Sequence, residues 1–415
     1  MGYEVAVESV VPNDRAGAGA VGNAPDPDVE FTLLDTESAA ADDIVERVHE
    51  LAHRIARELA ALGPSGWQRM TAVFALASAA EFADVGFEDE QRTLRARPPE
   101  SVLALAREQR WLTAQSDRGP WWRMLMRHTA GGTVEIDFDY GDEPFPDEQL
   151  FAPEVYRADL VTYPRRVLPT WLAAYLQHDG RQSRSPKQAA EAVRADRAAQ
   201  VAPVPSERDF PALPAMWARW AVMAAAFVAV GSPWGPRMRP ALGWFESTKR
   251  SGATLFVLPG KRAVLSGGLW NAPELAAAYA SGGPLPRLYA GAPEWVVNPV
   301  LNPRVAGGLL SFCYWWDHDR WYRGESPSAD KFSVAVPGLW TSGTVVEVIS
   351  GLFGEPDAAR QEAVAALVAA AESGAVTWAD LANVFGDNGN ADIDGAMCEL
   401  SLAGLAVSPG HRASK

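Results

Sequence analysis

The stretch PWWRMLMRHTAGGTVEIDFDY (residues 120–140) determines the fold expected for the first half of the chain. Apolar and polar residues alternate on both sides of the Gly131-Gly132 pair. An alternation with a period of two is typical of a strand that buries one face, and paired glycines allow a tight turn between two such strands. The stretch therefore predicts an antiparallel hairpin.

Helices and further strands are predicted before this hairpin. Apolar residues recur at helical spacing over residues 42–62, and the Gly63-Pro64 pair ends the pattern. Residues 67–87 carry the mixed alternation of paired strands, and residues 100–109 fit a second helix. We therefore expect an antiparallel sheet framed by helices.

The rest of the chain indicates a second domain of the same class. Two short helices split by proline close the first domain, and an exposed helix is predicted to start at Pro186 within a linker. Beyond the linker, the sequence predicts a helix over 217–230, several strands and an aromatic hairpin. From Asp357 onward it predicts three helices and a short strand, LAVSP.

The expected fold class is therefore α+β, with two domains that each pack an antiparallel sheet with helices. The predicted divisions are a flexible N-terminal tail with a possible short strand over 1–35, a first domain over 36–178, the linker over 179–208, and a second domain over 209–415 that ends in a small helical module.

Charge and cysteine content limit the partners that the chain can bind. The formal net charge of −15 opposes approach to nucleic acid or anionic lipid, which need Lys and Arg side chains to displace counterions. With only Cys313 and Cys398, the chain lacks a disulfide framework, as is usual in the cytoplasm. Residues 221–230, the longest apolar stretch, fall short of the roughly 20 residues that a membrane-spanning helix needs. Because the sequence also starts without a secretion signal, we expect a cytoplasmic protein with a basic protein partner.

The first predicted helix contains an HExxH motif, formed by His49, Glu50 and His53. Histidines four residues apart share one helix face and can bind zinc, while the glutamate can activate a metal-bound water. The motif lies away from the apolar stripe, among charged residues, on a face expected to be solvated. A third ligand would have to come from Glu81 or Asp84, so an exposed amphipathic helix is the simpler explanation.

Asp317, His318 and Asp319 lie between pairs of aromatic residues in CYWWDHDRWYRGE. A carboxylate beside an imidazole can form an acid–base group. In an extended strand, however, His318 would point away from both aspartates, because neighbouring side chains face opposite ways. We therefore expect the polar tip of a hairpin.

The C-terminal region resembles two known patterns only in part. Asp392 and Asp394 imitate the start of a calcium loop, but Ser401 stands where a bidentate Glu is required, so an N-cap at Asp392 is the better interpretation. The helix-helix-strand rhythm is typical of a DNA-binding module, yet residues 361–410 contain no Lys or Arg. We expect a helical packing module, and we find no phosphate loop or nucleophile motif that would indicate an enzyme or a cofactor.

The hairpin leads into FDYGDEPFPDEQLF (residues 138–151), which is rich in carboxylates. Between Glu135 and Asp159 the chain has nine acidic side chains and one basic one, Arg157. Carboxylates at such a density repel one another unless water solvates them, a metal binds them or a basic partner pairs with them. A solvated loop, a metal site and a docking surface are all compatible with it.

Residues 138–176 resemble the YezG-like immunity protein family. The resemblance rests on an aromatic and acidic segment, a P-E-x-Y helix, a Y-P-R segment and a proline-tryptophan-leucine turn. These are Tyr140, Asp142, Pro144 and Phe145; Pro153, Glu154 and Tyr156; Tyr163, Pro164 and Arg165; and Pro169, Trp171 and Leu172. It extends over roughly residues 36 to 178, and Gly141 is an insertion relative to the family pattern.

The resemblance implies a cytoplasmic antitoxin of a polymorphic toxin system, which inhibits a secreted toxin domain by protein–protein contact and has no catalytic activity. The arrangement is also similar to the N-terminal parts of actinobacterial NAD-cleaving toxins, but their catalytic segment has no counterpart here. A zinc metalloprotease that uses His49, Glu50 and His53, or a non-catalytic scaffold, are the alternatives.

Two surfaces are candidates for partner contact. Clustered carboxylates can steer a basic toxin face, and aromatic side chains can supply burial at the centre of the contact. The predicted contact residues are Asp137, Asp139, Tyr140, Asp142, Glu143, Phe145, Asp147 and Glu148 near the loop, and Trp315, Trp316, Asp317, Asp319 and Trp321 in the aromatic hairpin. A solvated loop and a buried aromatic core are the corresponding structural alternatives.

Overall fold

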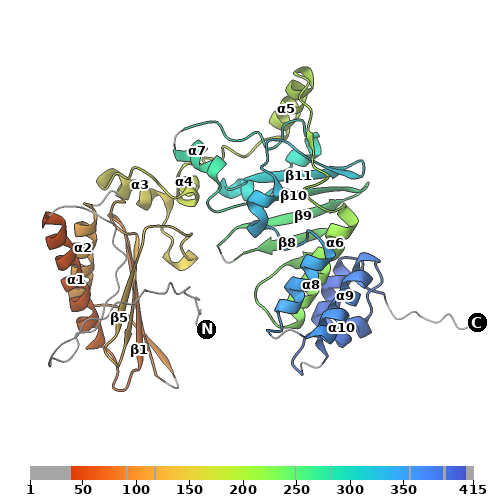
Figure 1. The fold of residues 1–415 in the computed structure, drawn as a ribbon. Helices are drawn as coiled ribbons and strands as arrows, with labels where there is room; N and C mark the ends of the chain where they lie inside the picture. Colours follow the sequence, from red (N-terminus) through yellow and green to blue (C-terminus); the bar gives the residue numbers. More distant parts are fainter. Residues whose placement is uncertain are drawn as a thin grey trace, which may run out of the picture. The chain divides into compact units, whose positions relative to one another are not determined.

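The structure, a computed structural model, describes residues 39–89, 92–115, 118–247, 249–280, 282–354, 357–386 and 389–407. The predicted N-terminal tail and its short strand lie outside these residues. Within the described residues the chain forms a five-stranded and a seven-stranded antiparallel sheet, both packed with helices (Figure 1). The predicted α+β class is confirmed.

The five-stranded sheet contains the predicted hairpin. Its strands are β1 (Arg69–Leu76), β2 (Glu81–Glu88), β3 (Thr93–Ala96), β4 (Arg123–Thr129) and β5 (Val134–Asp139), in the order β3-β2-β1-β4-β5. Gly132 makes the turn between β4 and β5 with a positive φ of 94°, which glycine adopts at little cost. The turn closes with a 3.0 Å hydrogen bond from the N–H of Thr129 to the carbonyl of Thr133.

Two helices cover one face of this sheet. Figure 1 places α1 (Ala39–Ala60) and α2 (Glu100–Thr113) side by side on it. The apolar stripe of α1 is buried, including Leu51, Ile55 and Leu59, and each such side chain contributes roughly 1.5–3 kcal/mol when it leaves water. Both helices were predicted from helical spacing, and both are confirmed.

The chain divides into two compact units, and the division passes through this sheet. One unit contains the chain up to Val73, with Ala83–Ala106 and Met124–Asp137; the other contains Phe74–Phe82, Arg107–Arg123 and everything from Phe138 onward. Helices α3 (Pro153–Thr162) and α4 (Thr170–Gln177) thus belong to the same unit as the seven-stranded sheet, because α4 packs against α7 (Pro273–Ala280). The boundary predicted at residue 178 stays a prediction.

The exposed helix predicted at Pro186 is present as α5 (Pro186–Ala198). Ser185 caps it, since its hydroxyl accepts a hydrogen bond from the N–H of Gln188 while the Gln188 side chain accepts one from the N–H of Ser185. The segment before the helix is held in place: the amide of Gln182 makes two 2.9 Å hydrogen bonds with the backbone of Leu310.

The seven-stranded sheet is a mostly sequential antiparallel array. Its order is β6-β12-β11-β10-β9-β8-β7, and its strands are β6 (Val204–Pro205), β7 (Arg237–Arg239), β8 (Leu242–Glu246), β9 (Gly252–Leu258), β10 (Arg262–Gly268), β11 (Phe312–Asp317) and β12 (Arg320–Arg323). The central strands were predicted from their apolar character, and they are present.

Layers on both faces bury the centre of this sheet. One face packs on α6 (Leu213–Ala229), a largely buried helix that also contacts α8 (Ser342–Gly351), α9 (Ala358–Glu372) and α11 (Ile393–Leu402). α10 (Trp378–Phe385) and η4 (Ala329–Ala335) complete this layer. The other face is covered by residues 288–310, which include η2 (Glu294–Val297) and η3 (Pro303–Gly307).

The C-terminal helices form the predicted packing module. As expected, Asp392 caps α11, and its carboxylate accepts a 2.8 Å hydrogen bond from the N–H of Gly395. The expectation of a strand at LAVSP is wrong for the residues that the structure describes there, which make only an isolated parallel bridge between Val376 and Ala406. One bridged pair is too little pairing to extend as a strand.

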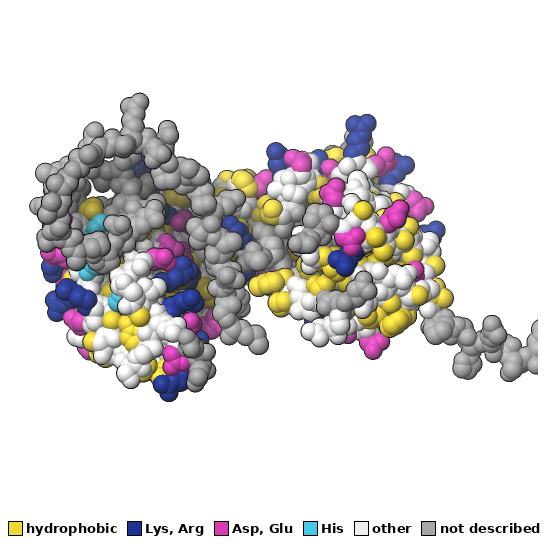
Figure 2. All heavy atoms as spheres, turned by 60° about the horizontal axis from the view of Figure 1, so that its bottom comes forward, with side chains coloured by type: hydrophobic (Ala, Val, Ile, Leu, Met, Phe, Trp, Pro, Cys, Tyr) yellow, Lys and Arg dark blue, Asp and Glu magenta, His cyan; other side chains and the backbone are white. Residues whose placement is uncertain are grey.

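Figure 2 shows a difference in surface character between the parts of the chain. On the face shown, cations and anions are interspersed in the part with the five-stranded sheet, whereas hydrophobic side chains gather in patches in the part with the seven-stranded sheet. None of the helices in the described part of the chain combines the length and apolar character needed to cross a membrane.

Candidate partner-binding site

The acidic segment forms a loop that is fixed from below by aromatic side chains. Phe145 is buried, and its ring meets the ring of Trp171 edge-on at a centroid distance of 5.0 Å. The indole N–H of Trp171 donates a 2.8 Å hydrogen bond to the carbonyl oxygen of Gly141. Tyr156 is buried in the same cluster, and its hydroxyl accepts a hydrogen bond from the N–H of Phe151. The loop is therefore tied to α3 and α4.

The turn at the start of the loop depends on Gly141. Its φ is +87°, and a Cβ at this position would lie 3.2 Å from the ring of Pro169. The carboxylate of Asp139 accepts a 2.8 Å hydrogen bond from the N–H of Gly141. The residue that departs from the family pattern is thus the one that allows the chain to turn here.

Most loop carboxylates pair with cations of this same chain. The ion pairs are Asp139 with Arg123 (2.8 Å), Asp142 with Arg118 (2.7 Å), Glu143 with Lys249 (2.6 Å) and Asp147 with Arg250 (2.9 Å). The last three are exposed to solvent, where such a pair contributes about 0 to 1 kcal/mol. The loop is therefore a set of weak, exchangeable ion pairs on a fixed backbone.

Further carboxylates that were predicted as contacts are exposed, namely Asp137 in β5 and Glu148 in the loop. Neither has an ion-pair partner among the described residues. Tyr140 is half-buried beneath the guanidinium of Arg118, which lies 4.2 Å from its ring centroid. Burial raises the pKa of Tyr140, and the positive charge of Arg118 opposes that shift. The loop thus brings together Tyr140, Asp142, Glu143, Asp147 and Glu148.

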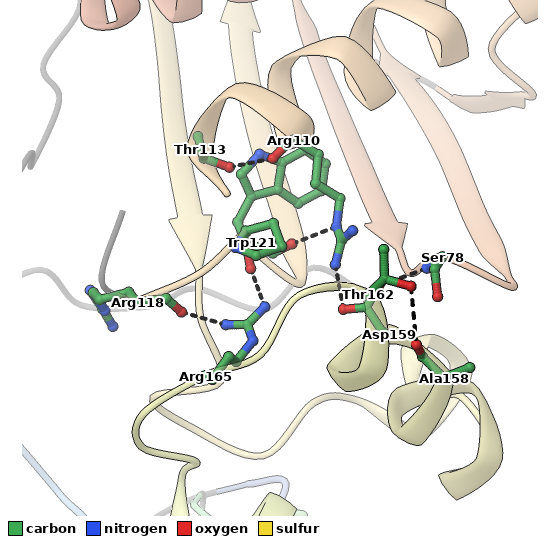
Figure 3. Close-up of polar contacts among 10 residues, drawn as sticks. Ser78, Arg110, Thr113, Arg118, Trp121, Ala158, Asp159, Thr162 and Arg165 are labelled. Atoms are coloured by element: carbon green, nitrogen blue, oxygen red, sulfur yellow. Dashed lines mark hydrogen bonds and ion pairs between the residues drawn. The ribbon is translucent and has the colours of Figure 1, made fainter. Parts of the chain in front are cut away.

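A buried ion pair supports the elements beneath the loop (Figure 3). Arg110 of α2 donates to Asp159 of α3 at 2.8 Å and to the carbonyl oxygen of Trp121 at 2.9 Å. Asp159 also accepts a 2.7 Å hydrogen bond from the N–H of Ser78, in the turn between β1 and β2. Because the side chain of Asp159 is fully buried, removal of either charge would leave the other without compensation.

Arg165 fixes the segment that leads into β4. Figure 3 shows its guanidinium directed at the carbonyl oxygen of Arg118, to which it donates a hydrogen bond. It also donates a hydrogen bond to the carbonyl oxygen of Pro120. The same guanidinium lies 4.0 Å from the ring centroid of Trp122. Burial lowers the pKa of Arg165, and the carboxylate of Asp159 opposes this effect. Arg165 of the Y-P-R segment therefore positions the backbone before β4, whereas Pro164 is exposed to solvent.

A groove of about 320 Å³ lies beside this polar cluster. The turn between β1 and β2 forms one side, and Trp111 and Tyr163 contribute aromatic rings. Trp111 is 56% exposed, although a side chain of its size is usually buried in a monomer. Trp111 was not among the contact residues predicted from the sequence. Its position off the buried stripe of α2, marked by Val102, Leu105 and Ala106, could have identified it.

Apart from Tyr140, the aromatic residues predicted as contacts are core residues, and this corrects the proposed surface. Phe145, Trp315 and Trp321 are 1% exposed, and Trp316 is 6% exposed. In β11, Trp316 faces the helical layer and Trp315 faces the opposite layer, so both sides of the strand are covered. Rings packed on both sides cannot reach a partner.

The tip of the aromatic hairpin is the predicted polar turn. His318 and Asp319 both have positive φ values, 50° and 60°, as in the tight turns that join two strands. The orientation expected for an extended strand does not apply to His318, because the residue lies in the turn, and its Nδ1 lies 3.2 Å from the carboxylate of Asp317. The turn abolishes the alternation of an extended strand. Asp317 and Asp319 lie on this hairpin and not on the acidic loop.

The residues of the HExxH motif do not fit a zinc site. Glu50 is exposed and pairs with Arg47 at 2.9 Å. His49 and His53 are half-buried rather than solvated, and burial, followed by the nearby His53, lowers the pKa of His49. Among the described residues, no three His, Cys, Asp or Glu side chains are grouped as metal ligands would be.

The acidic residues considered as third zinc ligands are engaged elsewhere. Glu81 pairs with Arg107 at 2.8 Å, and Asp84 lies 3.5 Å from Arg95. His53 instead lines a groove of about 550 Å³ together with Arg57 and His128. Three of the ten residues that line this groove are arginines, and their positive charges oppose the binding of a divalent cation.

Comparisons with known proteins leave the family open. No family model matches the chain, and it has no match among curated proteins. The resemblance to YezG-like immunity proteins therefore stays a prediction that rests on the motif residues. Four of them, Phe145, Tyr156, Trp171 and Leu172, are buried in one cluster with Trp122 and Leu176.

Proposed function

We propose that this protein is a cytoplasmic immunity protein that binds the catalytic domain of a secreted toxin and inhibits it by protein–protein contact. The observation that supports the proposal best is the acidic loop, whose backbone is fixed by Phe145, Trp171 and Gly141 while its carboxylates face solvent. A loop held in one conformation loses little entropy on binding, so more of the contact energy appears as affinity.

The electrostatics of the loop suit a basic partner. The exposed ion pairs of Asp142, Glu143 and Asp147 are weak, so cations of a toxin can replace the chain's own cations at small cost. Complementary charge also raises the rate of encounter, by roughly 10-fold to 1,000-fold in strongly steered pairs. The net charge of −15 acts in the same direction.

The exposed aromatic side chain of Trp111 supplies a second element of a contact surface. Buried tryptophans at the centre of an interface often cost more than 2 kcal/mol of binding when truncated. Trp111 lies beside a groove, where a protruding side chain of a partner can be enclosed. With Phe145 and the hairpin tryptophans in the core, Trp111 takes the role that those residues were predicted to have.

The test is co-expression of the full chain with the toxin domain encoded beside it, followed by co-purification and growth measurement. The loop variant Asp142→Asn, Glu143→Gln, Asp147→Asn, Glu148→Gln removes four charges. We expect it to fold, to associate at least about tenfold more slowly with the toxin, and to protect cells poorly.

A control variant separates a local effect from one of net charge. It removes four exposed carboxylates that lie away from the loop: Glu274, Glu294, Glu362 and Asp394. Its net charge equals that of the loop variant, so protection should remain intact. If the wild-type chain neither protects cells nor forms a complex, the immunity function is refuted for that toxin; equal loss in both variants would refute the role of the loop.

A further inference from the structure

One part of the seven-stranded sheet is left uncovered on the face opposite α6. The layer formed by residues 288–310 packs on β10 and β11, where Val264, Cys313 and Trp315 are buried beneath it. It does not extend over the whole of β7, β8 and β9, where Trp244 is 41% exposed. The sheet face and the edge of this layer therefore enclose a hollow.

The strand register places the lining residues on the same face. Trp244 pairs with Thr254 across β8 and β9, and Leu242 pairs with Phe256. On the other side, Leu242 pairs with Arg239 of β7. Directly paired residues of an antiparallel sheet project to the same side, so these five side chains point into one space. Together with Pro303, Arg304 and Glu246, they line a cavity of about 420 Å³.

The cavity contains a polar group without a partner. The hydroxyl of Thr254 is buried, the residue is only 7% exposed, and no hydrogen-bond partner is present for it among the described residues. A buried hydroxyl without a hydrogen bond costs about 1–3 kcal/mol. Such a group in the wall of a cavity is satisfied when a ligand supplies the missing partner.

The charges that line the cavity leave an excess of one positive charge. Arg304 donates a 2.8 Å hydrogen bond to the carbonyl oxygen of Arg250, and its guanidinium lies 3.7 Å from the carboxylate of Glu246. Arg239 is exposed and has no ion-pair partner in the part of the chain that the structure describes. The guanidinium of Arg239 is therefore available to an anion.

Two aromatic side chains in the cavity wall favour a ligand with a planar ring. Trp244 is partly exposed and Phe256 is half-buried, so both rings keep surface that a ligand can cover. Pockets of a few hundred cubic ångströms with mostly apolar walls and a few polar groups are typical of small-molecule sites. Planar rings pack well against such walls.

We propose that this cavity binds a small aromatic anion, whose ring packs against Trp244 and Phe256 and whose phosphate or carboxylate pairs with Arg239 while Thr254 supplies a hydrogen bond. The site lies on β7 to β9 and shares no residue with the acidic loop. It is a binding function in addition to toxin inhibition and does not depend on it.

The test is isothermal titration calorimetry of the full chain with four probes that separate ring from charge. AMP joins an aromatic ring to a phosphate, and benzoate joins one to a carboxylate; adenosine and inorganic phosphate each lack one half. We expect AMP, benzoate or both to bind, and adenosine and phosphate to bind at least about tenfold more weakly. Binding of AMP alone assigns the site to aromatic phosphates, and binding of benzoate alone assigns it to aromatic carboxylates.

Variants identify the site. Arg239→Ala removes the charge-assisted contact and should weaken binding about tenfold or more, and Thr254→Val removes the hydroxyl and should weaken it about fivefold. The control Arg262→Ala makes the same charge change at a guanidinium that lies over Trp295, outside the cavity, and should leave binding unchanged.

The proposal is overturned if neither AMP nor benzoate binds below about 10 mM. It is also overturned if phosphate alone binds as tightly as AMP, or if Arg239→Ala binds like the wild type. Thr254→Val deletes an unpaired hydroxyl with little change of shape, so we expect this variant to fold normally. It can therefore still test the site if Arg239→Ala folds poorly.

Discussion

At the scale of single residues, Asp159 is a buried carboxylate that several segments of the chain share. Its carboxylate joins α3, α2 through Arg110 and the turn between β1 and β2 through Ser78. A buried carboxylate is tolerated only when its partners satisfy it, and here both do. One side chain thereby fixes three segments that are far apart in the sequence.

The variant Asp159→Ala should lower the free energy of unfolding by about 3–5 kcal/mol, because Arg110 would stay buried without a counter-charge. Urea unfolding followed by circular dichroism measures this. Asp142→Ala is the matched control, since it also removes an Asp–Arg pair, but an exposed one, and should cost less than about 1 kcal/mol. Equal costs for the two variants would contradict the buried pair.

His49 makes the free energy of unfolding depend on pH in the acid range. Burial, helped by the charge of His53, lowers its pKa in the folded state below the ordinary value of 6.5. The folded state therefore binds this proton less readily than the unfolded state does, so its contribution to stability is complete above pH 6.5 and is lost as pH falls through the lowered pKa.

His49→Gln should consequently lose less stability than the wild type between pH 7 and pH 5, a window set by the lowered pKa of His49. Urea unfolding at several pH values provides the comparison. His318→Gln replaces an exposed side chain at a hairpin tip and should follow the wild type. A His49→Gln curve parallel to that of the wild type would exclude this histidine as the cause.

At the scale of elements, the local patterns of the sequence predicted most helices and strands, because helical spacing, alternation and proline or glycine positions are local properties. The hairpin of β4 and β5 and the start of α5 at Pro186 are examples. Long-range pairing is not local. Nothing near residue 143 indicates that Lys249 lies 2.6 Å from Glu143, so the acidic loop could be located but its neutralisation could not.

The aromatic hairpin was misjudged for a different reason. Phe312 to Trp316 form a continuous apolar run, and such a run is typical of a strand that is buried on both faces. The covering layers come from residues 213–229 on one side and 288–310 on the other. A sequence pattern indicates that both faces are buried, but it does not show which segments cover them.

The loop should lose its fixed conformation in Gly141→Ala. The positive φ costs roughly 1–2 kcal/mol in any L-residue, and the new Cβ would also press on Pro169 at 3.2 Å. Hydrogen exchange of residues 140–150 should accelerate, and toxin affinity should fall although no charge changes. Gly132→Ala has a similar φ of +94° in open space, so it should cost the same backbone energy and leave the loop unaffected.

At the scale of the whole molecule, charge determines how the protein meets other molecules. The net charge of −15 is large for 415 residues, and the segment from 361 to 410 contains no Lys or Arg. A field of one sign accelerates the approach of basic proteins and slows that of acidic ones. This field acts on the rate of association more than on the lifetime of a complex.

Association with the toxin should therefore slow by about tenfold or more when the salt concentration rises from about 50 mM to about 500 mM, while dissociation changes little. Stopped-flow or surface-based kinetics resolves the two rates. The four-charge loop variant should show a weaker dependence on salt than the control variant. An association rate that is indifferent to salt would contradict electrostatic steering.

Because Glu143 pairs with Lys249 and Asp147 pairs with Arg250, these two loop carboxylates already have cationic partners before a toxin binds. An incoming cation must displace a resident one, so recognition at these positions is a competition, and affinity measures the difference between two pairs. A single lysine of another protein would replace one ion pair by an equivalent one and would gain little binding free energy. A rigid array of guanidinium groups can pair with several carboxylates at once and would displace the resident cations. The resident cations would thereby increase the specificity of the loop, because they disfavour partners that offer only isolated cations.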